Sequence, residues 1–207
     1  MSVEVVTTTG VFALDGGEWE VTNNIWLLGD DRQVLVVDAA HDHAPIVGAV
    51  NGRRVSAIVL THGHNDHINA AIALQDVVDA PIWLHADDRM LWDVVYPNHA
   101  PDRVLKAGTV VRAGASEIVA RHTPGHSPGC CCLVATSDGV VFSGDTLFCG
   151  GPGATGRSFS NFPTIIESIR RELLTLPAET IVHTGHGDST TIGAEAPQLE
   201  EWIRRGH

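Results

Sequence analysis

The feature that most constrains this chain is the run Thr61-His62-Gly63-His64-Asn65-Asp66-His67, which directly follows an apolar segment. Its three imidazoles and one carboxylate are the usual ligands of zinc and similar divalent ions. The preceding segment, Val55–Leu60, is β-branched and apolar, which predicts a buried strand. The fold must therefore end a buried strand in a tight polar turn, and Gly63 lets the backbone bend there. The alternative interpretation is a polar loop of surface histidines.

The spacing within this run predicts two metal positions rather than one. His62 and His64 can point the same way in a turn and share one ion. Asp66 and His67 lie one turn further along the chain, where they can face a second ion. A lone His-x-His pair would carry much less weight than this denser cluster.

Three later motifs also place one candidate ligand in a turn. Each has an ordinary interpretation when taken alone: His126 as a turn histidine, Asp145 as a helix or turn cap, and His186 as a surface histidine. Their occurrence in this order after the first cluster favours a shared metal site. The motifs are Thr123-Pro124-Gly125-His126-Ser127-Pro128-Gly129, Ser143-Gly144-Asp145-Thr146 and Thr184-Gly185-His186-Gly187-Asp188.

Strand-like and helix-like segments interleave along the whole chain, which predicts an α/β fold. The 207 residues, 43% of them hydrophobic, fit a single domain over residues 1–207. Expected strands are Val3–Thr8, Val21–Leu28, Val34–Asp38, Val55–Leu60, Ile82–Leu84, Thr109–Arg112, Glu117–Arg121, Cys130–Ala135, Val140–Ser143 and Ile181–His183. Expected helices are Ala44–Val50, Ile68–Val78, Asp87–Val95, Pro163–Leu174 and Glu195–Arg205.

The composition narrows the classes of partner. A formal net charge of −12 disfavours nucleic acids and anionic membrane surfaces. No apolar run approaches the ~20 residues of a membrane helix, and the start MSVEVVTTTG lacks the pattern of a secretory signal. Cys130, Cys131 and Cys132 are adjacent in a strand-like run, which favours small core residues over a disulfide or a zinc site. We therefore expect a cytoplasmic protein.

The ordered motifs resemble the metallo-β-lactamase superfamily, whose pattern is His-x-His-x-Asp-His followed by a His, an Asp and a His. The resemblance extends from Asp38 to His186. It implies a four-layer αββα sandwich with the metal site at one edge. It also implies that His62, His64 and His126 hold the first ion, that Asp66, His67 and His186 hold the second, and that Asp145 bridges both. By the same resemblance, Asp38 supports the metal ligands without binding an ion itself.

Within the superfamily, the later motifs are most similar to the glyoxalase II group of hydroxyacyl-thiol thioesterases. The segments that carry this similarity are Ser143–Phe148, Gly156-Arg157-Ser158 and Thr184–Gly193. Two departures bear on the substrate: the loop Cys149–Gly156 is longer and richer in glycine than usual, and the C-terminal helical domain that binds glutathione in long members is missing. A mycothiol thioester, such as S-formylmycothiol, is therefore an alternative to a glutathione thioester.

The resemblance implies a binuclear metallohydrolase that holds two divalent ions, with zinc favoured and iron or manganese as alternatives. A water bridging the ions would lose its proton near neutral pH and attack the thioester carbonyl, with Asp66 as the catalytic group that orients it. We expect a small-molecule thioester as the partner, with neither nucleic acid nor membrane; a homodimer stays open. Alternative functions are a mononuclear iron persulfide dioxygenase and a lactone or phosphodiester hydrolase of the same superfamily.

Overall fold

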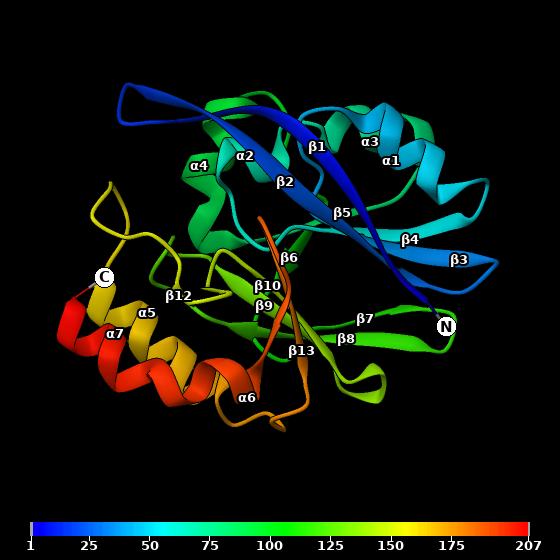
Figure 1. The fold of residues 1–207 in the computed structure, drawn as a ribbon. Coiled ribbons are helices and arrows are strands. Elements are labelled where there is room, and N and C mark those ends of the chain that lie inside the picture. The colour runs from blue at the N-terminus through cyan, green and yellow to red at the C-terminus, as the bar shows by residue number, and fades with distance from the viewer. Residues whose placement is uncertain (1, 207) are drawn as a thin grey trace.

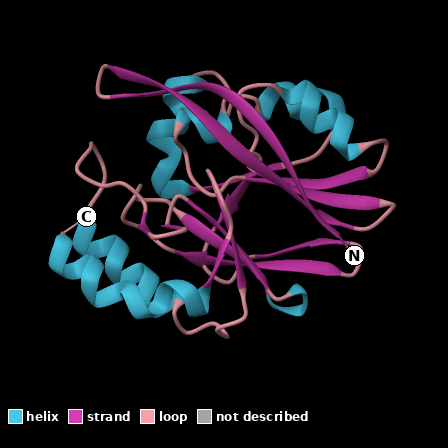
Figure 2. Cartoon of the chain, in the orientation of Figure 1, coloured by secondary structure: helices cyan, strands magenta, loops and turns pink. Residues whose placement is uncertain are grey.

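Strands that are apolar on both faces set the architecture of the computed structural model, which describes residues 2–206. In β3 (Gln33–Val37), Val34 and Val36 pack with helices on one side, whereas Leu35 and Val37 pack against the other sheet. All four side chains are buried. A strand covered on both faces must lie inside a layered fold, and Figures 1 and 2 show two sheets stacked between two layers of helices. The expected αββα sandwich is confirmed.

The first sheet is mixed and contains the N-terminal half of the chain. Strands β1, β2 and β3 are antiparallel neighbours, whereas β3, β4, β5 and β6 run parallel. The order β1-β2-β3-β4-β5-β6 has the bounds Ser2–Leu14, Gly17–Gly29, Gln33–Val37, Arg54–Val59, Ile82–His85 and Arg103–Leu105.

The second sheet is mostly antiparallel and comes from the C-terminal half. Its one parallel pair is β10 with β13. The order β14-β13-β10-β9-β8-β7 has the bounds Thr190–Thr191, Ile181–Thr184, Val140–Gly144, Cys131–Ala135, Ser116–His122 and Val110–Ala113. A separate small hairpin joins β11 (Leu147–Phe148) to β12 (Gly151–Pro152).

Helices cover the outer face of each sheet, and the space between the sheets forms a third apolar layer. Trp92 packs on the first sheet, Trp202 packs on the second, and Phe142 lies between the sheets. The α-helices are α1 (His43–Val50), α2 (Asn65–Ile68), α3 (Ala71–Val78), α4 (Arg89–Val95), α5 (Phe162–Ser168), α6 (Ile192–Glu195) and α7 (Leu199–Arg205). Short helical turns are η1 (Ala86–Asp88), η2 (Thr136–Asp138), η3 (Ile169–Leu173) and η4 (Ala196–Gln198). Among residues 2–206, no helix is both long and apolar enough to cross a bilayer.

Several predicted elements differ in extent from the observed ones. The expected helix Ile68–Val78 is broken, because the N–H of Ala70 donates to the carbonyl of Ala39 and the carbonyl of His67 accepts from the N–H of Ala39. The first two strands are longer than expected and pair along their whole length, from Ser2–Gly29 to Leu14–Gly17. Asp15 and Gly16 close this hairpin with φ of 53° and 76°, as a two-residue turn requires.

The three adjacent cysteines are buried core residues, as predicted. Cys131 packs between the sheets, whereas Cys132 faces the helices of the second half. Cys130, Cys131 and Cys132 are free thiols. Alternation along one strand thus places neighbouring cysteines in two different apolar layers.

Shortening a side chain in the layer between the sheets should destabilise the fold markedly. For Leu35→Ala we expect a loss of about 2–5 kcal/mol in the free energy of unfolding, because a cavity would open between the sheets. Urea denaturation followed by circular dichroism measures this loss. Val94, which is 82% exposed on α4, provides the control: Val94→Ala should change the stability by less than about 0.5 kcal/mol. Equal losses in the two variants would contradict the assigned core.

Candidate metal centre

All seven candidate ligands meet at one edge of the sandwich, although they come from four separate loops. The strands β3 and β4 are parallel, and so are β10 and β13, so that the carboxyl ends within each pair reach the same edge. Each apolar strand stops where its polar motif begins. The residues brought together are His62, His64, Asp66, His67, His126, Asp145 and His186.

The first group consists of three imidazoles whose inner nitrogens nearly touch. His64 Nδ1 lies 3.1 Å from His62 Nε2 and 3.0 Å from His126 Nε2. The rings of His64 and His126 stand at 86° to each other, so the rings do not stack and their nitrogens point at a common position. Zinc bonds of 2.0–2.1 Å in a tetrahedral site place such nitrogens about 3.3 Å apart. The spacing therefore fits three ligands of one ion.

The second group combines one carboxylate with two imidazoles. His186 Nε2 lies 3.3 Å from Asp66 Oδ2 and 3.2 Å from His67 Nε2. Asp145 lies between the two groups: its Oδ2 is 3.5 Å from both His126 Nε2 and His186 Nε2, and its Oδ1 is 3.3 Å from His67 Nε2. A carboxylate in that position can bridge two ions.

Buried polar atoms without partners test whether this cluster suits a metal. Asp66 Oδ1 is buried and has no hydrogen-bond partner, and Asp145 Oδ1 is buried with only the ring nitrogen of His67 nearby, outside hydrogen-bond geometry. An unpaired carboxylate oxygen in a protein interior carries a large desolvation cost unless a cation compensates for it. The donor set of imidazole and carboxylate matches zinc, iron or manganese. The residues present therefore fit divalent ions, and their role as ligands stays a prediction.

The outer nitrogens of four rings point at oxygen atoms, which fixes how the rings are oriented. His67 Nδ1 lies 2.9 Å from Asp38 Oδ2, which also binds Thr61 Oγ1. A proton held on the outer nitrogen leaves the inner nitrogen free to bind an ion. The other three contacts are His62 Nδ1 with Thr61 Oγ1 (3.2 Å), His126 Nδ1 with the Ala154 carbonyl (2.8 Å) and His186 Nδ1 with the Thr22 carbonyl (2.8 Å).

The two sides of the centre differ in their electrostatics. Burial lowers the pKa of His64 to about 3, and repulsion from His126 adds to this effect. Burial opposes the charged form of His186 as well, but attraction to Asp145 raises its pKa to about 10. Burial would also raise the pKa of Asp145, yet His67 and His186 hold it well below its ordinary value. On the first side, the lowered pKa values of His62 and His64 favour neutral imidazoles, whereas on the second side the carboxylates of Asp66 and Asp145 attract positive charge.

Asn23 is a supporting residue that the sequence analysis missed. Its Nδ2 donates to Asp66 Oδ2 at 3.1 Å, and its Oδ1 lies 2.9 Å from His41 Nε2. The ring of His41 in turn contacts Asn69. The only sequence cue was the polar pair Asn23-Asn24 in the otherwise apolar end of a strand.

The glycine-rich segment Cys149–Gly156 packs directly against the centre. A Cβ at Gly153 would lie 1.8 Å from the carbonyl oxygen of Asp145, so only glycine fits there. The next residue, Ala154, supplies the carbonyl that holds His126. Cys149 is exposed and is not among the residues that line the cavity. This loop therefore shapes the site through its backbone.

A cavity of about 380 Å³ opens above the ligands. Its walls are mainly apolar and come from the β1–β2 hairpin and from residues 148–157, which include the glycine-rich loop. The guanidinium carbon of Arg157 lies 3.9 Å from the centre of the Trp19 ring. Asn65 Oδ1 accepts from the N–H of Ala13 and holds the hairpin over the helix α2. The wall residues are Phe12, Trp19, Val21, Phe148, Ala154 and Arg157.

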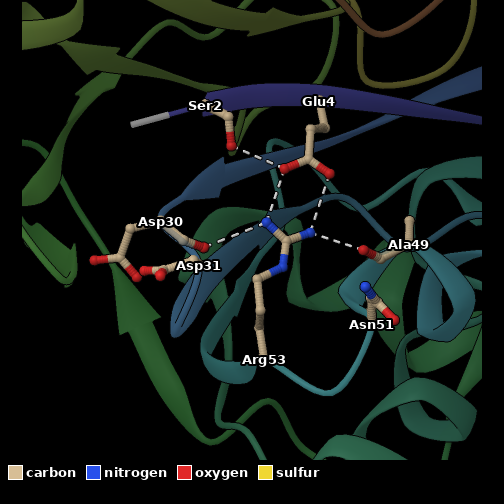
Figure 3. Close-up of a pocket in the computed structure, with 7 residues that line it drawn as sticks. All are labelled: Ser2, Glu4, Asp30, Asp31, Ala49, Asn51 and Arg53. Atoms are coloured by element: carbon tan, nitrogen blue, oxygen red, sulfur yellow. Dashed lines mark hydrogen bonds and ion pairs between the residues drawn. The ribbon is translucent and has the colours of Figure 1, made fainter.

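A larger hollow of about 580 Å³ lies at the opposite end of the strands, where Arg53 precedes β4. Figure 3 shows the Arg53 guanidinium pointing at the carboxylate of Glu4. The Nη1–Oε1 distance is 2.7 Å, and the Ala49 carbonyl accepts from Nη2 at 2.7 Å. The Arg53 guanidinium thus links β1 to the start of β4, and this hollow has a structural role.

Another cluster of metal-ligand types lies outside the centre. His85 stacks on His122 with ring centroids 4.2 Å apart, and Asp87 Oδ2 is 3.8 Å from His85 Nδ1. His122 Nε2 lies 2.9 Å from the Pro128 carbonyl, and His85 Nδ1 accepts from the N–H of Asp87. The nitrogens of two nearly parallel imidazole rings do not point at one common metal position. This group is therefore looser than the seven-residue centre and is satisfied by the backbone.

Comparisons with known proteins agree with this geometry. Residues 19–186 match the family described as the metallo-beta-lactamase superfamily. The chain is 31% identical to "Hydroxyacylglutathione hydrolase GloC" of Haemophilus influenzae, over 83% of this chain and 87% of that protein. Among solved structures, a B3 metallo-beta-lactamase called BLEG-1 is 28% identical with a TM-score of 0.79, covering 92% and 97% of the two chains. TTHA1623, solved in a di-iron-bound form, is 32% identical with a TM-score of 0.74, covering 85% and 93%.

Removing the carboxylate of Asp145 should empty the centre. For Asp145→Ala we expect both ions to be lost from the purified protein and turnover to vanish, because this side chain touches both groups of ligands. Elemental analysis of protein loaded with Zn²⁺ measures the metal content. Asp138→Ala, at the opposite end of β10, serves as the control and should keep the wild-type metal content. If Asp145→Ala kept both ions, the bridging role would be wrong.

Proposed function

The chain belongs to the metallo-β-lactamase superfamily, and from that membership we propose that it is a binuclear metallohydrolase that cleaves acyl-thiol thioesters. The observation that carries this proposal is the double group of ligands, joined by Asp145, at the floor of a cavity large enough for a small substrate. Two divalent ions held there supply Lewis acidity and a nucleophile derived from water at neutral pH. The remaining chemistry falls to side chains of this chain.

We propose that Asp66 orients the attacking water and accepts its proton. Its Oδ2 accepts from Asn23 Nδ2, whereas its Oδ1 is buried without a protein partner and the residue lines the cavity. Asn23 thereby fixes the carboxylate so that one oxygen stays available. Because a thiolate is a good leaving group, no separate acid is needed to expel it. A thioester thus suits this site, because the imidazoles and carboxylates that line the cavity are all candidate metal ligands.

The cavity favours a substrate that combines an apolar part with an anionic end. Phe12 and Trp19 form an aromatic wall, and Phe12 lies 5.3 Å from the ring of His64. Arg157 is the one side chain with a permanent positive charge among the lining residues. It stands over Trp19 at the rim, where it can meet a carboxylate on the thiol carrier. Both glutathione and mycothiol thioesters remain candidates, in line with the relative named hydroxyacylglutathione hydrolase.

A β-lactam hydrolase is the second candidate, because the BLEG-1 structure superposes over 92% of this chain. The thioesterase is preferred because Ser143–Phe148 and Gly156-Arg157-Ser158 resemble the corresponding segments of the glyoxalase II group. Zinc is proposed as the metal, with iron or manganese as alternatives. The relative that was solved in a di-iron-bound form supports iron. A persulfide dioxygenase, which shares most of these ligands but uses a single iron, and a lactone or phosphodiester hydrolase remain the alternatives.

Metal-loaded protein should hydrolyse at least one acyl thioester, and removal of the metal should abolish this activity. Free thiol released from lactoylglutathione and formylmycothiol measures turnover, with a lactone, a phosphodiester and a chromogenic cephalosporin assayed in parallel. Chelation should remove the activity and added Zn²⁺, Fe²⁺ or Mn²⁺ should restore it. Hydrolysis of the cephalosporin alone, or oxygen uptake with a persulfide and no thioester turnover, would replace the proposal by the corresponding alternative.

Loss of the Arg157 charge should weaken the binding of anionic thioesters without slowing the chemical step. For Arg157→Gln we expect KM to rise about tenfold with a carboxylate-bearing thioester, as for the loss of one charge-assisted contact, and kcat to stay unchanged. A neutral thioester should show no change in KM. Arg112→Gln, which removes an exposed arginine paired with Glu117, is the matched control. An equal effect on neutral and anionic substrates would contradict the role given to Arg157.

A further inference from the structure

A buried carboxylate outside the metal centre joins two of its loops. Asp88 closes the turn η1 and is fully buried. Its Oδ2 accepts from the N–H of Gly63 at 2.8 Å and from Ser127 Oγ at 2.6 Å, and its Oδ1 accepts from the N–H of Gly129 at 2.6 Å. Three neutral donors on short bonds thus surround a group that burial would otherwise destabilise.

These donors belong to the loops that carry the first group of imidazoles. Gly63 separates His62 from His64, and Ser127 directly follows His126. We propose that Asp88 is a positioning residue, which clamps these two loops together and thereby sets the affinity of the first metal position. It does so without belonging to any group of candidate ligands.

The packing around Asp88 shows that the clamp requires a close approach. A Cβ at Gly63 would lie 2.9 Å from Asp88 Cβ, and a Cβ at Gly129 would lie 2.7 Å from Asp88 Cγ. Glycine at both positions therefore lets the backbone come within hydrogen-bonding distance of the carboxylate. The side chain is fixed on both sides, which leaves the imidazoles little freedom to move apart.

The second metal position has different supports. Asp38 contacts the outer nitrogen of His67, and Asn23 donates to Asp66. Asp88 bonds to none of these groups. The clamp therefore predicts a selective effect: loss of Asp88 should weaken the first ion and spare the second. A purely structural role in the fold would weaken both.

The test uses Asp88→Asn in the full chain. The carboxamide keeps the shape, but it replaces one acceptor with an NH₂ group that must face a fixed N–H donor. We expect the Kd of the first Zn²⁺ to rise about 10–100-fold, as for other partners behind a metal ligand, and the Kd of the second to change less than about threefold. Competition with a chromophoric chelator gives both constants. Imidazole ¹⁵N spectra of assigned histidines identify the weakened position as that of His62, His64 and His126.

Three further variants make the result decisive. Asp87→Asn, at the exposed neighbouring position, is the matched control and should keep both constants. Ser127→Ala removes one of the three bonds and should weaken the first ion by about 2–12-fold, so the proposal can be judged even if Asp88→Asn does not fold. Asn23→Ala should show the reverse pattern and weaken the second ion. Equal weakening of both ions in the Asp88 and Ser127 variants, or no weakening in either, would overturn the proposal.

Discussion

The face-to-face packing of the two sheets is the interaction on which the metal centre depends. His62, His64, Asp66 and His67 follow a strand of the first sheet, whereas His126, Asp145 and His186 follow strands of the second. Neither half carries a complete site. The apolar layer between the sheets, which includes Leu35 and Phe142, sets the distance between the halves. Nitrogens from opposite halves come as close as 3.0 Å, and the buried side chains of this layer hold the two sheets at the distance that this contact requires.

Each half of the centre also has its own polar support. Asp38, Asn23 and Asp88 are buried or nearly so, and each directs its hydrogen bonds at a ligand or at the backbone beside one. A polar group of this kind is costly to bury unless all its bonds are made. The hydrogen bonds that Asp38, Asn23 and Asp88 make offset this cost and hold the candidate ligands in place.

The walls of the cavity come from two segments, the β1–β2 hairpin and the residues in and around the glycine-rich loop. The hairpin tip and the glycine-rich loop meet where the N–H of Ser158 donates to Asp15 Oδ2 at 3.0 Å. Aromatic side chains on one segment and Arg157 on the other then define what fits above the ions. Binding groups carried on loops over a stiff scaffold are how one fold serves several substrates.

The sequence by itself determined the ligand types and the apolar strands that precede them, because these follow from local periodicity and from a dense, ordered motif. The four-layer class came only from the resemblance of that motif to a known superfamily. It could not give the break after Ile68 or the full length of the first hairpin, since both depend on backbone bonds to distant segments. It also passed over Asn23 and Asp88, which look like an ordinary strand residue and an ordinary residue at the start of a helix. Only the tertiary structure decided which groups bond to Asn23 and Asp88, because the hydrogen-bond partners of both residues lie far away in the chain.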